Sequence, residues 1–366
     1  MKKSFFSKAI VALMVLMLVA FSMVFVGCDD DSGYKGSAKN VVLLIGDGMG
    51  FEHLELTKAY YGLESLYMET MTSVHLEATT HSRNSDVTDS AASSTALSCG
   101  VKVDNKNIAT LDGKNIENMD EFVAGQNMDM GIVLTDRVVG GTAAGFASHS
   151  KDRSNTVNIF NGYMASSVDL FISQYNKDTL SATREEMILN KGYNRYNSLA
   201  EMAENAVAKS KIFATSPEFA GYGEDGETLA DASTLALNHL KGMSDNGFFL
   251  MIESSHIDKY SHSGSVEDVV KEIRAFDEAV KAVIDWAKQD GNTIVIVTAD
   301  HETGGLVYNP GDEFNKNLFK DGDNHTGANV GVFIYGLNKK DLAGVTVIDN
   351  IVINALMRQY IINYRK

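Results

Sequence analysis

The stretch Val41–Gly48, which reads Val-Val-Leu-Leu-Ile-Gly-Asp-Gly, decides the fold of this 366-residue chain. Five apolar residues in a row, three of them β-branched, are typical of a strand that is buried on both faces, as in a parallel sheet. Comparable short apolar runs occur at Gly131–Leu134, Phe248–Ile252, Thr293–Val297 and Val330–Tyr335. We therefore expect these segments to form the centre of one sheet.

Amphipathic stretches lie between the apolar runs. In Val266–Lys288 the apolar residues recur at helical spacing, and shorter stretches of the same kind are Ser198–Lys209 and Thr228–Leu240. Strands that alternate with helices predict an α/β fold, here a three-layer sandwich with a central mostly parallel sheet flanked by helices. We assign residues 40–366 to a single domain of this kind.

Acidic and imidazole side chains directly follow three of the predicted strands. They are Asp47, Glu253 and the pair Asp300-His301. Open α/β sheets bind ligands just beyond the carboxyl ends of their strands, so these side chains are expected to converge on one site. A lone aspartate at such a place more often caps the next helix. Here such side chains follow three separate strands, which favours a shared site.

The segment Glu253–His262 is rich in groups that bind metals. Asp258 and His262 are four residues apart, so a helical turn would place both on one face, whereas His256 would point elsewhere and is assigned to packing. His325 lies in an Asn-His-Thr-Gly loop. Mixed Asp/His sets suit Zn²⁺, and all-oxygen sets that include a hydroxyl suit Mg²⁺. The remaining histidines have no ligand-like partner in sequence: His53, His75, His81, His149 and His239.

The segment Asp89–Gly100 is built from small residues and predicts a helix that packs closely on the sheet, with Gly100 at its C-terminal cap. Ser90 would then stand at the positive end of the helix dipole, where backbone N–H groups also favour phosphate oxygens. No Ser-His-Asp spacing and no Gly-x-Ser-x-Gly motif accompanies it. An activated Ser90 hydroxyl would therefore need a metal to lower its pKa.

Five motifs in a fixed order carry a resemblance. They are Asp47-Gly-Met, Asp89-Ser-Ala-Ala-Ser, Glu253 with Ile-Asp-Lys and His262, Thr298-Ala-Asp-His-Glu-Thr-Gly-Gly, and His325-Thr-Gly. Together they resemble the alkaline phosphatase family from about residue 40 to the C-terminus. The resemblance implies hydrolysis of small phosphomonoesters through a covalent phosphoserine, at a site that holds two Zn²⁺ and one Mg²⁺. It leaves a homodimer open.

The resemblance also assigns roles by position. Ser90 is the implied nucleophile and lies against the second zinc. The implied ligands of the first zinc are Asp258, His262 and His325, and those of the second are Asp47, Asp300 and His301. The implied magnesium ligands are Asp47, Glu253 and Thr142. Arg153, four residues after His149, is implied to grip two phosphate oxygens, with Asp89 orienting it.

Two departures from the family pattern stand out. Gly140 occupies the position, two residues before Thr142, where family members often carry an aspartate or histidine. We therefore expect the third metal to bind more weakly, through water. The segment Ser154–Ala214 fits the pattern poorly, and its part in substrate access is left open.

The N-terminus predicts export. Three lysines precede an apolar run that ends at Gly27-Cys28, which indicates a signal peptide over residues 1–27 and a lipid anchor at Cys28 on a flexible tether, residues 28–39. The alternative is an uncleaved membrane anchor. Either way the enzyme faces the periplasm or the exterior of a bacterial membrane. Cys99 is the one other cysteine, so a lipidated Cys28 excludes an internal disulfide.

The charge of the chain restricts its partners. The formal net charge is −16, and the signal segment contains three lysines and no acid, so the mature chain is near −19. Such a surface repels nucleic acid and phosphate esters at long range. An enzyme for anionic substrates would then need local positive charge, which bound cations supply.

Two further functions remain as alternatives at this stage. A phosphodiesterase, sulfatase or phosphonate hydrolase of the same superfamily uses a similar two-metal core, although the context of Cys99 does not fit a sulfatase. A surface lipoprotein that binds phosphate or metal without catalysis is the other alternative. Such a non-catalytic protein would be expected to lack some of the zinc ligands, whereas this chain has a residue at all six zinc-ligand positions.

Overall fold

The computed structural model describes residues 36–222, 227–243, 245–337, 342 and 344–365. The predicted signal peptide, Cys28 and most of the predicted tether lie outside these residues. Within them, no helix combines the length and the apolar character that a membrane crossing requires.

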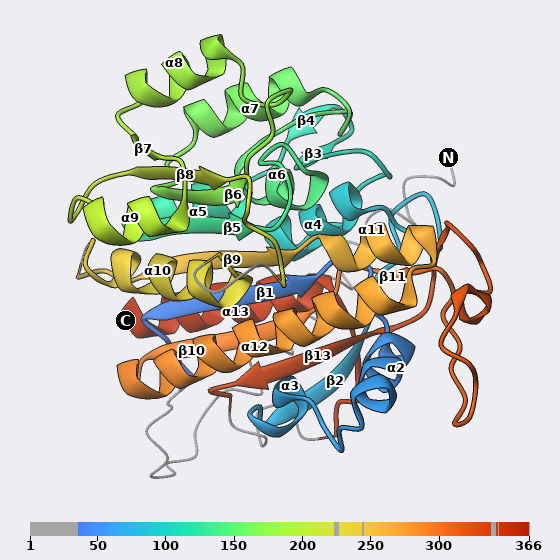
Figure 1. Cartoon of the computed structure of the whole chain (residues 1–366). Coiled ribbons are helices and arrows are strands. Elements are labelled where there is room, and N and C mark those ends of the chain that lie inside the picture. The colour runs from blue at the N-terminus through green and yellow to red at the C-terminus, as the bar shows by residue number, and fades with distance from the viewer. Residues whose placement is uncertain (1–35, 223–226, 244, 338–341, 343, 366) are drawn as a thin grey trace, which may run out of the picture.

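A ten-stranded sheet forms the middle layer (Figure 1), with the order β14-β2-β13-β10-β1-β9-β5-β6-β8-β7. Its strands are β1 (Asn40–Gly46), β2 (Val74–Thr79), β5 (Asp129–Leu134), β6 (Leu170–Gln174), β7 (Asn194–Tyr196), β8 (Ile212–Ser216), β9 (Phe248–Ser254), β10 (Thr293–Thr298), β13 (Val330–Tyr335) and β14 (Val347–Asp349). Two small ribbons pair β3 (Thr110–Leu111) with β4 (Lys114–Asn115), and β11 (Glu302–Thr303) with β12 (His325–Thr326).

Helices cover both faces of this sheet. α10 and α12 cross one face over β5, β9 and β10, while α6 and α13 contact β9 and β1 from the other side. The helices are α2 (Phe51–Tyr61), α3 (Tyr67–Thr70), α4 (Ser90–Cys99), α5 (Met119–Gly125), α6 (Gly141–Ala147), α7 (Thr156–Ala165), α8 (Ala182–Asn190), α9 (Leu199–Asn205), α10 (Leu229–Lys241), α11 (His256–Ser263), α12 (Val266–Asp290) and α13 (Ile351–Arg365), with a 3₁₀ turn at Lys316–Leu318.

The predicted three-layer α/β sandwich is confirmed. All five apolar runs are strands, and the three amphipathic stretches overlap α12, α9 and α10. β1 is buried along its whole length because β9 and β10 pair with it in parallel on either side and helices cover both faces. Five apolar side chains in succession are the pattern that such a central position requires.

One strand differs from the expected orientation. β13 runs antiparallel to both β10 and β2, although its sequence resembles that of the parallel strands. Its burial is the same in either direction, so the apolar pattern carries no information about strand polarity. The strands β2, β6, β7, β8 and β14, towards the two sides of the sheet, were not among the predicted runs.

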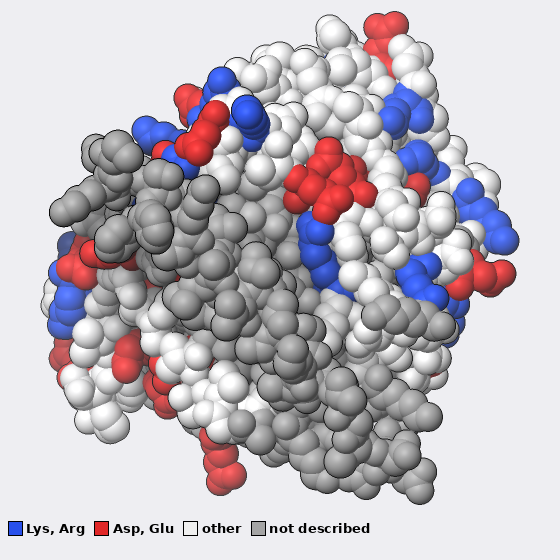
Figure 2. All heavy atoms as spheres, turned by 180° about the vertical axis from the view of Figure 1, so that it is seen from behind, with Lys and Arg blue, Asp and Glu red and all other residues white. Residues whose placement is uncertain are grey.

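Charged side chains on the far side of the molecule are mixed. Over the part of that face drawn in colour, lysines and arginines lie scattered among acidic residues and do not form a continuous stripe (Figure 2). A nucleic-acid groove would show such a stripe. The absence of one on this part of the surface agrees with the acidic composition.

Candidate active site

The carboxyl ends of three adjacent strands form the floor of the site. β1 leads into Asp47, β9 ends with Glu253 and Ser254, and β10 leads into Asp300 and His301. The parallel registers place Ile45 beside both Glu253 and Thr298, so the three strands end at the same level. The structure therefore places Asp47, Glu253, Asp300 and His301 at the same edge of the sheet.

Ser90 reaches the same edge from α4. Asp89 caps this helix, because its Oδ1 accepts a hydrogen bond of 2.9 Å from the N–H of Ala92, and Gly100 ends the helix with a left-handed φ of 71°. Ser90 is buried, and its Oγ lies 3.2 Å from Nε2 of His301. The predicted helix is therefore present, and its first residue presents a hydroxyl to the ends of the strands.

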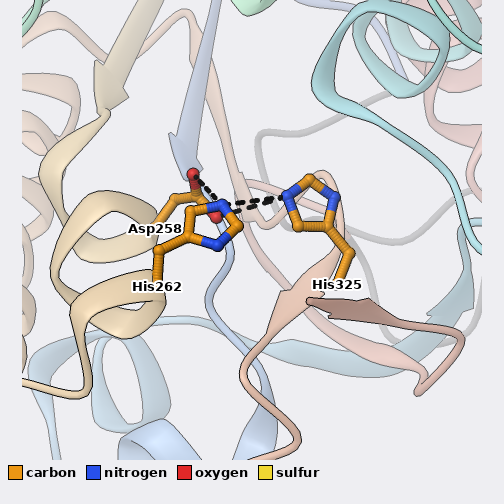
Figure 3. Close-up of side chains that lie close together, drawn as sticks. All are labelled: Asp258, His262 and His325. Atoms are coloured by element: carbon orange, nitrogen blue, oxygen red, sulfur yellow. Dashed lines mark hydrogen bonds and ion pairs between the residues drawn. The ribbon is translucent and has the colours of Figure 1, made fainter. Parts of the chain in front are cut away.

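Asp258, His262 and His325 form the first cluster of possible metal ligands (Figure 3). Nε2 of His262 lies 3.2 Å from Oδ2 of Asp258, and Nε2 of His325 lies 3.6 Å from Oδ1 of Asp258. The two Nε2 atoms face each other at 3.3 Å. α11 supplies the first two residues at i and i+4, as the sequence predicted, and β12 supplies the third.

The tautomers of these two histidines favour a shared cation. Nδ1 of His262 lies 2.6 Å from the carbonyl oxygen of Asp323, and Nδ1 of His325 lies 3.0 Å from that of Thr88. A carbonyl only accepts, so both Nδ1 atoms must donate, and in the neutral ring the Nε2 atoms keep their lone pairs. Two lone pairs and a carboxylate that point at one another are satisfied by a metal ion between them.

The second cluster comprises Asp47, Asp258 and His301. Nε2 of His301 lies 3.4 Å from Oδ1 of Asp47 and 3.3 Å from Oδ2 of Asp300. Oδ1 of Asp300 is already engaged, because it accepts hydrogen bonds from the backbone N–H groups of Gly48 (3.2 Å) and His301 (3.0 Å). Its other oxygen is therefore left to face the cluster. Asp258 belongs to both clusters and joins them.

Buried negative charge dominates the electrostatics of the site. Burial, together with the neighbouring Asp300, raises the pKa of Asp47 well above its ordinary value. Burial also raises the pKa of Glu253 to about 8, against hydrogen bonds from Ser255 and Thr142. The pKa of Asp258 is instead lowered, because hydrogen bonding and charge from the histidines outweigh its burial. The pKa of His301 is lowered by burial, so its ring is neutral and able to bind a metal.

The oxygen-rich end of the site lies around Glu253. Thr142, in the first turn of α6, is buried and interacts with the Glu253 carboxylate. Gly140 precedes this helix with a φ of −62°, and a Cβ built there would have only Arg137 O at 3.6 Å and Leu134 Cδ1 at 4.0 Å as neighbours. The position is thus open to a side chain but supplies none.

Arg153 lies beside the helix that carries Ser90. Its Nη1 is 3.2 Å from Oδ2 of Asp89, and the backbone N–H of Lys106 donates to the same oxygen at 3.0 Å. Gly141 makes room for the guanidinium, because a Cβ there would lie 3.0 Å from Arg153 Cζ. One third of the Arg153 side chain stays exposed, which leaves donors free for a ligand.

Several supporting groups were not found from the sequence. Thr303 donates to Oδ1 of Asp258 at 2.5 Å and lies 3.3 Å from Nδ1 of His301. The β11–β12 ribbon pairs Thr303 with His325 and stacks the ring of His325 on that of His301, with centroids 3.7 Å apart. Lys259 pairs with Asp136 at 2.6 Å beside Glu253. The spacing of Thr303, two residues after His301, is the one sequence signal that could have indicated such a contact.

The residues present fit bound cations. In the described part of the chain, Asp47 Oδ1, Asp300 Oδ2 and Glu253 Oε2 are buried and have no hydrogen-bond partner. Three buried carboxylate oxygens without a hydrogen-bond donor are costly unless a positive ion satisfies them. The donor types, imidazole with carboxylate in two clusters and carboxylate with hydroxyl around Glu253, suit Zn²⁺ and Mg²⁺ respectively.

This chain is similar to several known proteins. A family model described as alkaline phosphatase matches residues 38–210 and 218–323. Alkaline phosphatase 3 of Bacillus subtilis is 32% identical over 333 residues, which cover 83% of this chain and 71% of that protein. Repressible alkaline phosphatase of Saccharomyces cerevisiae is 27% identical over 349 residues, which cover 82% of this chain and 62% of that protein.

A solved structure has a similar fold. The alkaline phosphatase of the Antarctic bacterium TAB5 superposes with a TM-score of 0.75 at 26% identity, covering 88% of this chain and 98% of that one. The first matched range of the family model runs through residues 154–210, for which the sequence predicted a poor fit. His325 lies just beyond the second range, so its place in the site rests on geometry.

Proposed function

This chain belongs to the alkaline phosphatase family, and from this premise we propose that it hydrolyses phosphomonoesters to an alcohol and phosphate through a phosphoserine on Ser90. The observation that carries the proposal is the contact of 3.2 Å between Ser90 Oγ and His301 Nε2, at the N-terminus of α4 and beside two clusters of metal ligands. A buried hydroxyl at such a place is suited to nucleophilic attack.

We propose two zinc sites and one magnesium site for the clusters described above. Asp258, His262 and His325 would hold one zinc; Asp47, Asp300 and His301 would hold the other; Asp47, Glu253 and Thr142 would hold magnesium. Bound there, the ions would supply positive charge for the phosphoryl oxygens and lower the pKa of a coordinated hydroxyl or water. They would also offset the net negative charge of the protein near the substrate.

The chain's own residues position the ester. Arg153 offers a planar fork of N–H donors to two non-bridging phosphate oxygens, and Asp89 keeps the guanidinium on the Ser90 side of the site. The first-turn N–H groups of α4 favour negative charge at the same point. Ser90 Oγ loses its proton and bonds to phosphorus as the opposite bond to the ester oxygen breaks, and that oxygen takes up a proton and leaves as the alcohol. Water then attacks phosphorus, the bond to Oγ breaks, and phosphate and the Ser90 hydroxyl are released.

Hydrolysis of two model esters tests the proposal. The purified enzyme is assayed with p-nitrophenyl phosphate and with bis(p-nitrophenyl) phosphate, before and after chelation and after return of Zn²⁺ and Mg²⁺. We expect strong preference for the monoester, loss of turnover on chelation and recovery with the metals. A preference for the diester would favour a phosphodiesterase, and metal or phosphate binding without turnover would favour a non-catalytic lipoprotein.

We also propose export and attachment to a bacterial membrane through lipid on Cys28. The support is the sequence alone: a basic start, an apolar run and the Gly27-Cys28 junction. Cys28→Ala should release the enzyme from the membrane fraction or leave the signal uncleaved, and labelled fatty acid should no longer enter the protein. Unchanged labelling of the variant would show that Cys28 is not the residue that carries the lipid.

A further inference from the structure

A buried carboxylate lies behind the ligand-bearing turn and takes no part in the proposed chemistry. Glu272, on α12, has no exposed surface. Its partners are Ser254, the last residue of β9, and His256, the first residue of α11. The turn where β9 meets α11, residues 254–256, is flanked by Glu253 on one side and Asp258 on the other. We propose that Glu272 is a positioning residue that fixes this turn, and through it the metal ligands at both ends. The inference rests on the metal-binding part of the proposed function.

Two contacts connect Glu272 to the turn. Oε1 lies 3.4 Å from Nδ1 of His256 but has no hydrogen-bond partner, and Oε2 accepts a hydrogen bond of 3.4 Å from the Ser254 hydroxyl. A fully buried carboxylate is retained only where a partner offsets its desolvation. Both partners here belong to the turn: Ser254 is bonded to Glu253 in the chain, and His256 is two residues from Asp258.

The start of α11 lies against Glu272. Ser255 occupies the N-cap position of α11 but makes no side-chain capping bond, unlike Asp89 at the start of α4. The helix that carries Asp258 and His262 therefore begins without the usual support from its cap. Glu272 instead contacts the side chain of its first residue, His256, and places negative charge where a helix N-terminus favours it.

A glycine from a distant loop covers the carboxylate. A Cβ added to Gly221, in the loop after β8, would lie 1.7 Å from Oε2 of Glu272. The backbone at Gly221 has no left-handed φ, so alanine would be tolerated there except for this collision. Gly221 thus lies directly against the Glu272 carboxylate, and a methyl group at residue 221 should push the carboxylate away from Ser254.

The experiment compares two disturbing variants with two matched controls. Glu272→Gln removes the charge and keeps the shape, and Gly221→Ala keeps the charge and shifts it. Glu278→Gln changes an exposed glutamate on the same helix, and Gly125→Ala adds a methyl where no atom lies within 4 Å. For each protein the zinc affinity is measured by chelator competition, the visible spectrum of the Co²⁺-substituted site is recorded, and unfolding is followed with and without metal.

We expect both disturbing variants to bind zinc about ten- to a hundredfold more weakly than the wild type, as for other groups that orient metal ligands. Their Co²⁺ spectra should change, and their metal-dependent gain in stability should shrink. The controls should match the wild type. Because Gly221→Ala retains Glu272 and its charge, it tests the inference even where Glu272→Gln does not fold.

Two results would overturn the inference. One is zinc affinity and a Co²⁺ spectrum in both variants equal to those of the controls. The other is an equal loss of stability in the metal-free and metal-loaded forms, which marks a purely structural role. Failure of the wild type itself to bind zinc would instead refute the proposed metal site, so the two failures are distinguishable.

Discussion

Ser90 Oγ and His301 Nε2 lie 3.2 Å apart although 211 residues separate them in the chain. The contact joins the first turn of α4 to the residue that follows β10. It holds the hydroxyl against one of the proposed zinc ligands, so a single ion at His301 would also reach Ser90. The proposed roles of nucleophile and ligand therefore depend on the same contact.

Removing the hydroxyl should separate catalysis from metal binding. Ser90→Ala is expected to lower the turnover of p-nitrophenyl phosphate by a factor on the order of 10³ or more, because the covalent route is lost. Zinc content, measured by mass spectrometry, should stay unchanged, since the ligand clusters remain. Ser210→Ala, which alters an exposed loop hydroxyl bonded to the Val207 carbonyl, is the control. Substantial activity in Ser90→Ala would refute the nucleophile assignment.

The place of Asp258 in both clusters predicts an unequal response to two substitutions. Asp258→Asn should weaken both zinc sites, whereas His262→Ala should weaken only the one that it shares with His325. Metal stoichiometry after dialysis against a limiting chelator measures the difference. Equal zinc loss in the two variants would show that Asp258 does not connect the sites.

Arg153 should strengthen the binding of phosphate. Arg153→Lys keeps the charge and loses the planar pair of donors. The free energy of phosphate binding should then become less favourable by about 1.5–3 kcal/mol, the contribution of a hydrogen bond to a charged group. We expect KM and the inhibition constant of inorganic phosphate to rise about ten- to a hundredfold. Arg184→Lys, a change on α8 that leaves the site untouched, should have no such effect. Unchanged phosphate inhibition in Arg153→Lys would exclude the clamp.

The open position at Gly140 predicts a gain of function. Gly140→Asp adds a carboxylate two residues before Thr142, and neither the φ of −62° nor the nearest atom at 3.6 Å opposes it. Magnesium affinity, measured by calorimetry on zinc-loaded protein, should increase. Gly125→Asp serves as the control for added charge. A decrease in affinity would mean that the space at residue 140 faces away from the oxygen-rich end.

His53 predicts how stability depends on pH. Burial lowers the pKa of this α2 residue to about 4 from 6.5, and its Nδ1 accepts a hydrogen bond from the N–H of Gly50. The unfolded chain takes up the proton first, so stability is retained above pH 6.5 and lost as the pH falls towards 4. The full loss is about 3 kcal/mol.

Urea unfolding of the chelated protein at pH 7 and pH 4.5 tests this expectation. His53→Gln should lose less stability than the wild type between the two pH values. His75→Gln, a change at an exposed strand position, should behave like the wild type. The raised pKa values of Asp47 and Glu253 act in the opposite sense, but both residues are present in all three proteins. An equal change of stability in the wild type and His53→Gln would therefore contradict the expectation for His53.

The sequence predicted those parts of the site that depend on local pattern. Asp47 and Asp300 stand directly after apolar runs, and the i, i+4 spacing of Asp258 and His262 is a property of one helical turn. Thr303 and Glu272 could not be predicted, because their roles arise from packing between segments far apart in the chain. The antiparallel direction of β13 escaped prediction for a similar reason, since burial on both faces selects the same side chains in either orientation.

The position of β1 in the sheet has a consequence for biosynthesis. This strand is made first, yet both of its neighbours, β9 and β10, emerge from the ribosome more than two hundred residues later. Until then a wholly apolar segment has exposed N–H and C=O groups on both edges, which is a template for aggregation. The nascent chain must therefore be shielded until most of it has been synthesised, and a fragment that stops before Thr293 leaves β1 without its β10 partner.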